Sequence, residues 1–165
     1  MPWRPMTPHD LGQVQALADA IHVGHPEDSE VLAERQRLYP QGCFMLVENG
    51  RAIGYALTHP WSFAEPPSLN RLLGAVPFPA TTYYVHDVAL LPEARGKGYA
   101  AQITSLLVNH AHDAGFDNLS LVAVNTSQIF GEKAGFRVIP VPGLEAKLAS
   151  YGPDAALMVR DVASP

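Results

Sequence analysis

The sequence has a single cysteine, no long apolar run and no excess of basic residues. Cys43 stands alone among 165 residues, which excludes an internal disulfide and a metal site built from several cysteines. No apolar run approaches the roughly 20 residues of a membrane-spanning helix, and the start lacks the basic head and apolar core of a signal peptide. The formal net charge of −5 argues against general nucleic-acid binding. We therefore expect a cytoplasmic protein with neither a nucleic-acid nor a membrane partner.

What remains is the pattern of an ordinary globular protein. The length suits one domain, and no repeat or linker divides the sequence, so residues 1–165 are expected to form a single domain. Three consecutive strands in the middle of the chain indicate a mixed α/β (α+β) sheet covered by helices rather than a regular doubly wound fold. Apolar periodicity predicts helices at 8–21, with Thr7 as N-cap, and at 30–39, 98–114 and 125–134. Strands are predicted at 2–6, 43–61, 82–91, 119–124, 136–141 and 155–162, and the segment 43–61 is a hairpin that turns at Asn49-Gly50. Residues 60–81 are predicted to form a proline-rich loop with a helical turn at 68–74.

The most informative stretch is RGKGYA, residues 95–100, where a strand turns into an alanine-rich helix. The first N–H groups of a helix have no intrahelical partner, and the helix dipole adds positive potential there. Gly96 and Gly98 let an anion approach the backbone closely, and Arg95 and Lys97 add positive charge. The stretch therefore predicts a phosphate-binding cradle. A tight turn that needs glycine, with two solvated basic residues, is the alternative interpretation.

Two common phosphate motifs fit this stretch poorly. A Walker loop needs Gly-x-x-x-x-Gly-Lys-Ser/Thr, which the sequence does not contain. A dinucleotide fingerprint fits only if Ala101 is its last residue, and no acidic residue ends the following strand at 119–124. A nucleotide-phosphate-binding protein of Rossmann type is therefore the less favoured alternative.

A known family has both of this chain's local motifs. Arg95, Gly98 and Ala100, after the strand VALLP, resemble the Gln/Arg-x-x-Gly-x-Gly/Ala motif of the GNAT superfamily of acetyl-coenzyme A-dependent N-acyltransferases. FGEKAGF, residues 130–136, resembles the family's later F-Y-E-K-x-G-F motif. The resemblance implies a GNAT-type, mostly antiparallel sheet flanked by helices. It also implies an enzyme that transfers an acetyl group from acetyl-CoA to a primary amine of a small molecule or peptide by direct attack in a ternary complex, and it leaves a homodimer open.

The resemblance also assigns residues to the coenzyme. The cradle would hold the pyrophosphate, and backbone groups of the preceding strand would hold the pantetheine arm. Asn125 matches a position near the pantetheine, and the N–H of Leu90 would polarise the thioester oxygen. The coenzyme-binding residues implied in this way are Val88, Ala89, Leu90, Arg95, Gly96, Lys97, Gly98, Tyr99, Ala100, Asn125, Ser127 and Phe130.

Two residues of the strand before the cradle, His86 and Tyr84, are predicted to be catalytic. In the arylalkylamine branch of the family, a histidine at the place of His86 relays the proton of the amine, so His86 is expected to be the general base. A histidine that only hydrogen-bonds within the sheet is the alternative. A carboxylate in an apolar strand indicates that Asp87 has a partner. Regular alternation would put Tyr84, His86, Val88 and Leu90 on one face and Tyr83, Val85, Asp87 and Ala89 on the other.

The sequence departs from the family at Gly131, where a tyrosine often protonates the departing thiolate. Glycine cannot do so, although a thiol with a pKa of about 8.5 is already a fair leaving group at neutral pH. Tyr83, Tyr84 and Tyr151 are the candidates for a proton donor from elsewhere. Gly131 is also expected to open room beside the thioester for a bulkier acyl group or substrate. A catalytically silent coenzyme-A-binding sensor or interaction domain is a further alternative, which Gly131 slightly favours and the intact strand face with His86 disfavours.

The acceptor is expected to enter between the first helices and the loop at 60–81. Carboxylates and aromatic rings in these segments suit an amine cation, although acidic residues on a solvated loop beside a small satellite core are equally natural. His22 and His25 form only a weak metal-binding pair without a third ligand, so no metal is expected. The remaining residues that these segments offer to the acceptor are Glu27, Asp28, Glu30, Trp61, Phe63 and Glu65.

Overall fold

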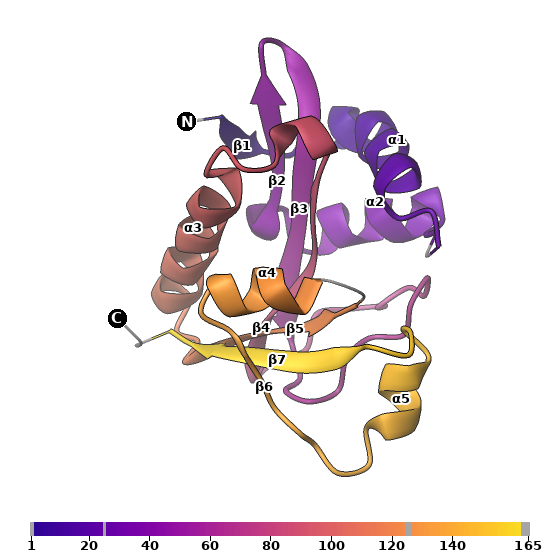
Figure 1. Ribbon diagram of the computed structural model, residues 1–165, viewed down its shortest axis with the longest axis vertical. Coiled ribbons are helices and arrows are strands. Elements are labelled where there is room, and N and C mark those ends of the chain that lie inside the picture. Colours follow the sequence, from indigo (N-terminus) through magenta and orange to yellow (C-terminus); the bar gives the residue numbers. More distant parts are fainter. Residues whose placement is uncertain (1, 25, 125–126, 163–165) are drawn as a thin grey trace.

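The computed structural model describes residues 2–24, 26–124 and 127–162 (Figure 1). These residues form a mixed sheet of seven strands in the order β1-β2-β3-β4-β5-β7-β6. Neighbouring strands are antiparallel except β4 and β5, which are parallel. The predicted mixed sheet flanked by helices is confirmed. The elements are β1 (Trp3–Pro5), α1 (Leu11–Ile21), α2 (Ser29–Leu38), β2 (Cys43–Glu48), β3 (Arg51–Trp61), β4 (Thr82–Leu90), α3 (Tyr99–Asp113), β5 (Asn118–Ala123), α4 (Ser127–Lys133), β6 (Arg137–Val138), α5 (Glu145–Ala149) and β7 (Ala156–Asp161).

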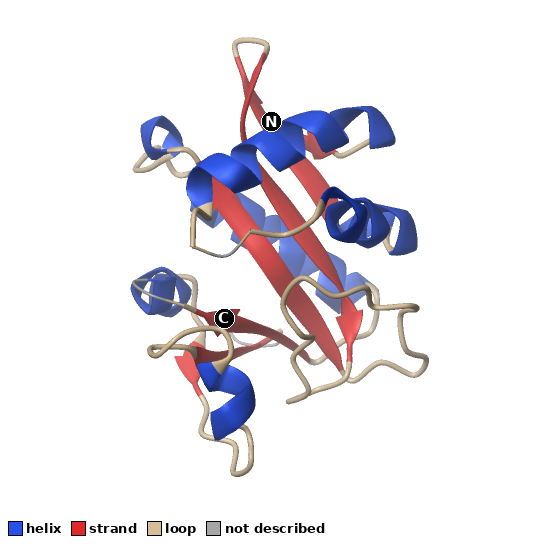
Figure 2. Ribbon diagram, turned by 90° about the vertical axis from the view of Figure 1, so that its right-hand side faces the viewer, coloured by secondary structure: helices blue, strands red, loops and turns tan. Residues whose placement is uncertain are grey.

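Helices cover both faces of the sheet, so the protein has a core on each side (Figures 1 and 2). Leu17 of α1 and Leu32 of α2 pack with Tyr55 of β3 on one face. Ile103 and Leu107 of α3 belong to the core on the other face, as their helical spacing predicts. Within the described ranges, no helix is long and apolar enough to cross a membrane.

Glycine and asparagine set two local turns that the sequence predicts. Asn49 and Gly50 have φ values of 54° and 75°, which suit the two-residue turn that joins β2 and β3. Gly115 follows α3 with a φ of 88°, so the helix ends where a left-handed residue is available.

Three elements differ from the prediction. β6 comprises only Arg137–Val138, because Pro140 and Pro142, which follow it, cannot donate to a strand ladder. The helix α5 was not predicted, because its five residues are too few to give a clear periodic signal in the sequence. Residues 68–74 form no helix. Their backbone groups instead contact buried side chains of α2: Glu34 accepts from Leu73 (2.6 Å) and Gly74 (3.0 Å), and Arg35 donates to the carbonyl oxygen of Arg71 (3.2 and 3.3 Å).

A β-bulge interrupts the pairing of β3 with β4. Asp87 pairs with Leu57, whereas Val85 pairs with Thr58, so His86 is an extra residue on β4. Regular alternation of side chains therefore ends at His86. This one-residue irregularity decides which side chains of β4 reach the functional site.

Candidate functional site

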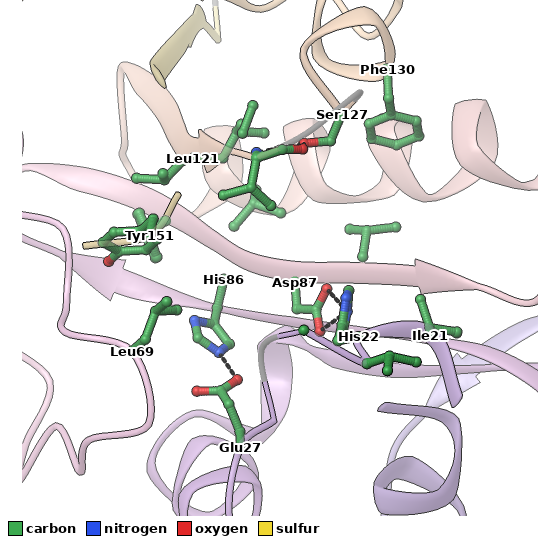
Figure 3. A pocket seen from close by; sticks show the side chains of 18 residues that line it. Ile21, His22, Glu27, Leu69, His86, Asp87, Leu121, Ser127, Phe130 and Tyr151 are labelled. Atoms are coloured by element: carbon green, nitrogen blue, oxygen red, sulfur yellow. Dashed lines mark hydrogen bonds and ion pairs between the residues drawn. The ribbon is translucent and has the colours of Figure 1, made fainter. Parts of the chain in front are cut away.

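A cavity of about 430 Å³ lies where β4 and β5 separate (Figure 3). Among the described residues, the two strands pair only at Tyr83–Leu119 and Tyr84–Ser120, and the later parts of β4 and β5 diverge. Figure 2 shows the two parts of the sheet spreading apart. The cavity is lined by residues of β4, β5, α4, the end of α1 and four loops, namely Ile21, His22, Val23, Gly24, Glu27, Leu69, Tyr84, Val85, His86, Asp87, Val88, Leu121, Val122, Ala123, Val124, Ser127, Phe130 and Tyr151.

The bulge brings His86 and Asp87, which are consecutive in sequence, into the same cavity. Beyond the bulge the alternation is reversed. Val88 and Leu90 pack against the core under α3, and Ala89 belongs to the core under α1 and α2. The predicted assignment of faces is therefore wrong: Asp87 lies with His86, and Val88 and Leu90 lie opposite. Sequence alternation could not reveal this, because it assumes an unbroken ladder.

His86 is paired with a carboxylate from the loop between α1 and α2. Its Nε2 lies 2.8 Å from Oε1 of Glu27. Only 7% of the His86 side chain and 12% of the Glu27 side chain are exposed. Burial alone would raise the pKa of Glu27, but the hydrogen bond and charge of His86 and the charge of Arg35 lower it to about 2. Glu27 is therefore ionised at neutral pH and accepts the Nε2 proton, so Nδ1 is the nitrogen of His86 that is left for another group.

A second histidine–carboxylate pair lies beside the first (Figure 3). Nε2 of His22, just after α1, is 2.9 Å from each carboxylate oxygen of Asp87. The buried Tyr55 hydroxyl donates to Oδ2 of Asp87 over 2.5 Å. The hydrogen bond that His22 donates to Asp87 raises the pKa of His22 above 6.5, against the opposing effect of burial. The prediction that Asp87 has a partner is confirmed, and that partner is a residue predicted only for acceptor binding.

The loop between β3 and β4 closes one end of the cavity. Leu69 lines the cavity from this loop. The neighbouring Asn70 donates its N–H to Oε2 of Glu27 over 3.3 Å, and its Oδ1 accepts the N–H of Asp28 over 2.7 Å. One carboxylate therefore contacts both the loop, through Oε2, and His86, through Oε1.

The three candidate tyrosines lie in different places. Tyr84 and Tyr151 line the cavity, whereas Tyr83 is buried in the core under α3, where its hydroxyl lies 2.6 Å from that of Thr58. Tyr83 is therefore not a proton donor to this cavity. Burial, together with the charge and hydrogen bond of Tyr151, raises the pKa of Tyr84 well above 10. Burial raises the pKa of Tyr151 to about 12, and its hydroxyl donates to the carbonyl oxygen of Pro67.

The cradle residues lie at the start of α3. Gly96 and Gly98 have φ values of 77° and 85°, and Gly98 is the N-cap of the helix. A β-carbon at either glycine would have no other atom within 4 Å, so the space beside this backbone is open. Tyr99 and Ala100 begin the helix, where the N–H groups have no intrahelical partner. This open, donor-rich backbone fits an anionic pyrophosphate.

The charged side chains around the cradle have local partners. Arg95 donates to the carbonyl oxygen of Leu90 over 3.3 Å. Nζ of Lys97 lies 3.3 Å from Oε1 of Glu48, and the Tyr99 hydroxyl donates to the other oxygen of Glu48. The charge of Glu48 offsets that of Lys97, so Lys97 would attract an anion at this helix start less than its charge alone suggests.

The edge of β4 presents backbone groups to the gap. Leu91 donates its N–H to the carbonyl oxygen of Ile53 on β3 over 2.9 Å. Bonded and non-bonded pairs alternate along an antiparallel ladder, so Val88 and Leu90 direct their backbone groups toward β5 and Ala89 toward β3. Because β5 has diverged there, Val88 and Leu90 have backbone groups directed into the gap, whereas Ala89 does not.

Helix α4 contributes Ser127 and Phe130 to the cavity. The Ser127 hydroxyl oxygen accepts the backbone N–H of Val124 over 2.7 Å. A β-carbon at Gly131 would lie 2.7 Å from Sδ of the buried Met158, so the expectation that Gly131 opens room beside the thioester is wrong. Met158 already occupies that space. Asn125, predicted to contact the coenzyme, lies outside the described residues.

Of the residues predicted for the acceptor, the structure brings His22 and Glu27 to the cavity. Trp61 packs instead on His59, with ring centroids 5.5 Å apart, and donates to the carbonyl oxygen of Glu65. His25, the other half of the suggested metal pair, lies outside the described residues. The predicted acceptor residues that are not among those lining the cavity are Asp28, Glu30, Trp61, Phe63 and Glu65.

Solved structures with the same fold extend over nearly the whole chain. The loading GNATL domain of CurA from Lyngbya majuscula has a TM-score of 0.80 at 14% identity and covers 97% of this chain and 96% of its own. The GphF GNAT-like decarboxylase, in complex with isobutyryl-CoA, has a TM-score of 0.80 at 13% identity, with coverage of 98% and 100%. Naa20 from Chaetomium thermophilum, in complex with a bisubstrate analogue, has a TM-score of 0.73 at 19% identity, with coverage of 98% and 86%. At these identities the likeness shows the fold alone.

Sequence comparison gives the family independently of the structure. No curated protein matches the chain in sequence. The sequence model of the acetyltransferase (GNAT) family, in contrast, matches residues 13–136, a range that runs from α1 to the residue before β6 and includes the cradle. With this match, the separated central strands and the helix start after β4, the chain belongs to the GNAT acetyltransferase family.

Proposed function

We propose that the protein transfers an acetyl group from acetyl-coenzyme A to a primary amine of a small molecule or peptide, by direct attack in a ternary complex. The observation that carries this proposal is the His86–Glu27 pair inside the cavity between β4 and β5. The relatives support a CoA-type cosubstrate, since GphF holds isobutyryl-CoA and Naa20 holds a bisubstrate analogue. The acetyl group and the amine are our inference from the family and from the chemistry of the cavity.

In this proposal the coenzyme lies along the chain from the cradle to the cavity. The helix start at Gly98 would hold the pyrophosphate, with Arg95 and Lys97 adding charge. The backbone groups of Val88 and Leu90 that face the gap would bind the pantetheine arm. The N–H of Leu90 is our candidate donor to the thioester oxygen, where a preorganised donor contributes about 3 kcal/mol in other acyl transfers.

His86 would act as the general base. An amine with a lysine-like pKa of about 10.4 costs roughly 4.6 kcal/mol to neutralise at pH 7, so the site must remove a proton before or during attack. Nδ1 of His86 can accept that proton while Glu27, which binds Nε2, stabilises the resulting imidazolium. We assign Tyr84, whose pKa is raised well above 10 by burial, to contact with the acceptor rather than to proton donation.

The test is acetyl-CoA turnover with a panel of amines, comparing the wild type with His86→Ala. We expect turnover at neutral pH to fall by about 10²–10⁴-fold, and to recover partly at high pH, where the amine loses its proton unaided. The affinity for coenzyme A should stay unchanged, as it should in His112→Ala, a control at an exposed histidine of α3. An unchanged pH–rate profile would remove His86 from the role of base.

A silent coenzyme-A-binding domain is the competing function, because α4 supplies Gly131 where the family often has a tyrosine acid. Wild-type protein that binds coenzyme A but turns over no amine in the panel would favour it. A Rossmann-type dinucleotide site has no support here, because the sheet has only one parallel pair among the described strands.

A further inference from the structure

The proposed function leaves the departing thiolate without a proton donor. Of α4, Ser127 and Phe130 line the cavity, and Ser127 is engaged with the backbone of Val124. The space that a side chain at position 131 would need is filled by Met158. The second histidine–carboxylate pair has no role in the reaction described so far.

The position of this second pair along β4 is informative. The chain leads from the cradle back through Leu90 and Val88 to Asp87, and only then to His86 and Tyr84. A coenzyme arm that follows β4 from the cradle therefore meets the His22–Asp87 pair before the His86–Glu27 pair. In Figure 3 Asp87 and His22 lie on the side of Ile21 and Phe130, whereas His86 and Glu27 lie toward Leu69 and Tyr151.

The pair is built to hold one histidine in a fixed orientation. Asp87 binds Nε2 of His22 with both oxygens and also accepts the Tyr55 hydroxyl, so its position is fixed from β3 as well as from β4. About one third of the His22 side chain is exposed, and the residue lines the cavity. With Nε2 engaged by Asp87, Nδ1 is the nitrogen of His22 that is available to another group.

We propose that His22, held by Asp87 and Tyr55, is the general acid that protonates the sulfur of coenzyme A as it leaves. This inference rests on the proposed function and deepens it. As the carbon–sulfur bond of the thioester breaks, its electron pair goes to sulfur and the Nδ1 proton of His22 follows. His22 becomes neutral and regains a proton from solvent after the products leave. The ammonium loses two protons as it becomes an amide. His86 accepts the first before attack and releases it to solvent, and accepts the second as the tetrahedral intermediate collapses, so the two histidines have separate tasks.

The charges around His22 suit a protonated imidazole. Asp87 on β4 and Glu27 on the loop after α1 both raise its pKa, and burial opposes them. Tyr55 on β3 faces Asp87 rather than His22, and burial keeps its hydroxyl protonated by raising its pKa. The two carboxylates thus favour an imidazolium close to where a thiolate would form.

The test measures the thiol of bound coenzyme A itself, by following thiolate absorbance as pH rises in wild type, His22→Gln and His112→Gln. An imidazolium near the sulfur should lower the thiol pKa by about one unit or more, which is about ten times more thiolate at a given pH. We expect this shift in the wild type and the His112→Gln control and its loss in His22→Gln. Asp87→Asn, which keeps the imidazole but removes the negative charge that holds its proton, should lose most of the shift.

Turnover gives a second measure once an amine acceptor is found. We expect His22→Gln to lower kcat about tenfold or more, with the KM for acetyl-CoA within twofold of the wild type. A thiol that titrates identically in wild type and in both folded variants would overturn the role of His22 while leaving the proposed function intact. Wild-type protein that binds no coenzyme A would overturn the proposed function and this inference together.

Discussion

The cradle before α3 and the proposed acceptor end of the cavity, which contains His86 and Glu27, are made of different chemical groups. The cradle uses backbone N–H groups, made accessible by Gly96 and Gly98. The acceptor end uses side chains, of which His86 and Glu27 are almost fully buried. A site made of backbone groups should lose ligand affinity when the backbone conformation changes, and should tolerate the replacement of its side chains. A site made of buried, paired side chains should be sensitive to loss of either partner.

The largest expected effect is on the free energy of unfolding, whose pH dependence tests the buried pair of Glu27 and His86. The pKa of Glu27 is lowered from 4.5 to about 2, so its ionised form stabilises the fold by on the order of 3 kcal/mol. Because this pKa is depressed, the contribution is complete above pH 4.5 and is lost as the pH falls toward 2. Urea unfolding should therefore show Glu27→Gln to be less stable than wild type at pH 7, with the difference vanishing near pH 2.

The matched control for that measurement is Glu132→Gln, at an exposed carboxylate of α4. It should change the free energy of unfolding by less than about 0.5 kcal/mol at pH 7. A difference between wild type and Glu27→Gln that does not depend on pH would contradict the ion-pair interpretation.

The next effect tests the backbone of the cradle. Gly98 has a φ of 85°, a conformation that costs an ordinary residue about 1–2 kcal/mol and a β-branched one more. Gly98→Val should therefore displace the first turn of α3 and weaken coenzyme A binding by about tenfold or more, as measured by calorimetry. Gly12→Val, at a helical glycine with ordinary φ and open space, should leave the affinity unchanged. Equal affinities of Gly98→Val and wild type would remove the cradle from the binding site.

The smallest effect tests the side chains of the cradle. Lys97 is half exposed and already paired with Glu48, so its attraction for a phosphate is screened. Lys97→Ala should weaken coenzyme A binding only a few-fold, and the difference should shrink as salt is added. Lys133→Ala, at an exposed lysine of α4, should have no effect. A loss as large as that of Gly98→Val would mean that side-chain charge, not backbone, dominates the cradle.

The same contrast explains which parts could be predicted from sequence. The cradle depends on the spacing of Arg95, Gly98 and Ala100 within six residues, and the β2–β3 turn depends on Asn49-Gly50. Local spacing of this kind is visible directly in the sequence. The helix–strand order was also predictable, because amphipathic stripes such as that of Ile103 and Leu107 repeat regularly.

The partners of the acceptor end were not predictable, because they depend on register and on loops. The extra residue at His86 moves Asp87 to the same side of the sheet, which a period of two cannot anticipate. Glu27 and His22 reach His86 and Asp87 across 59 and 65 positions of the sequence. Glu27 was predicted as one of the residues offered to the acceptor, but nothing in the sequence paired it with His86.

The two oxygens of Glu27 link the orientation of His86 to the loop between β3 and β4. One oxygen binds His86 and the other binds the N–H of Asn70, in the loop that closes one end of the cavity. Displacement of this loop would remove one of the two bonds that orient the carboxylate. Under the proposed function, the imidazole would then be best oriented with the loop in place, and less well oriented when the cavity is open to water.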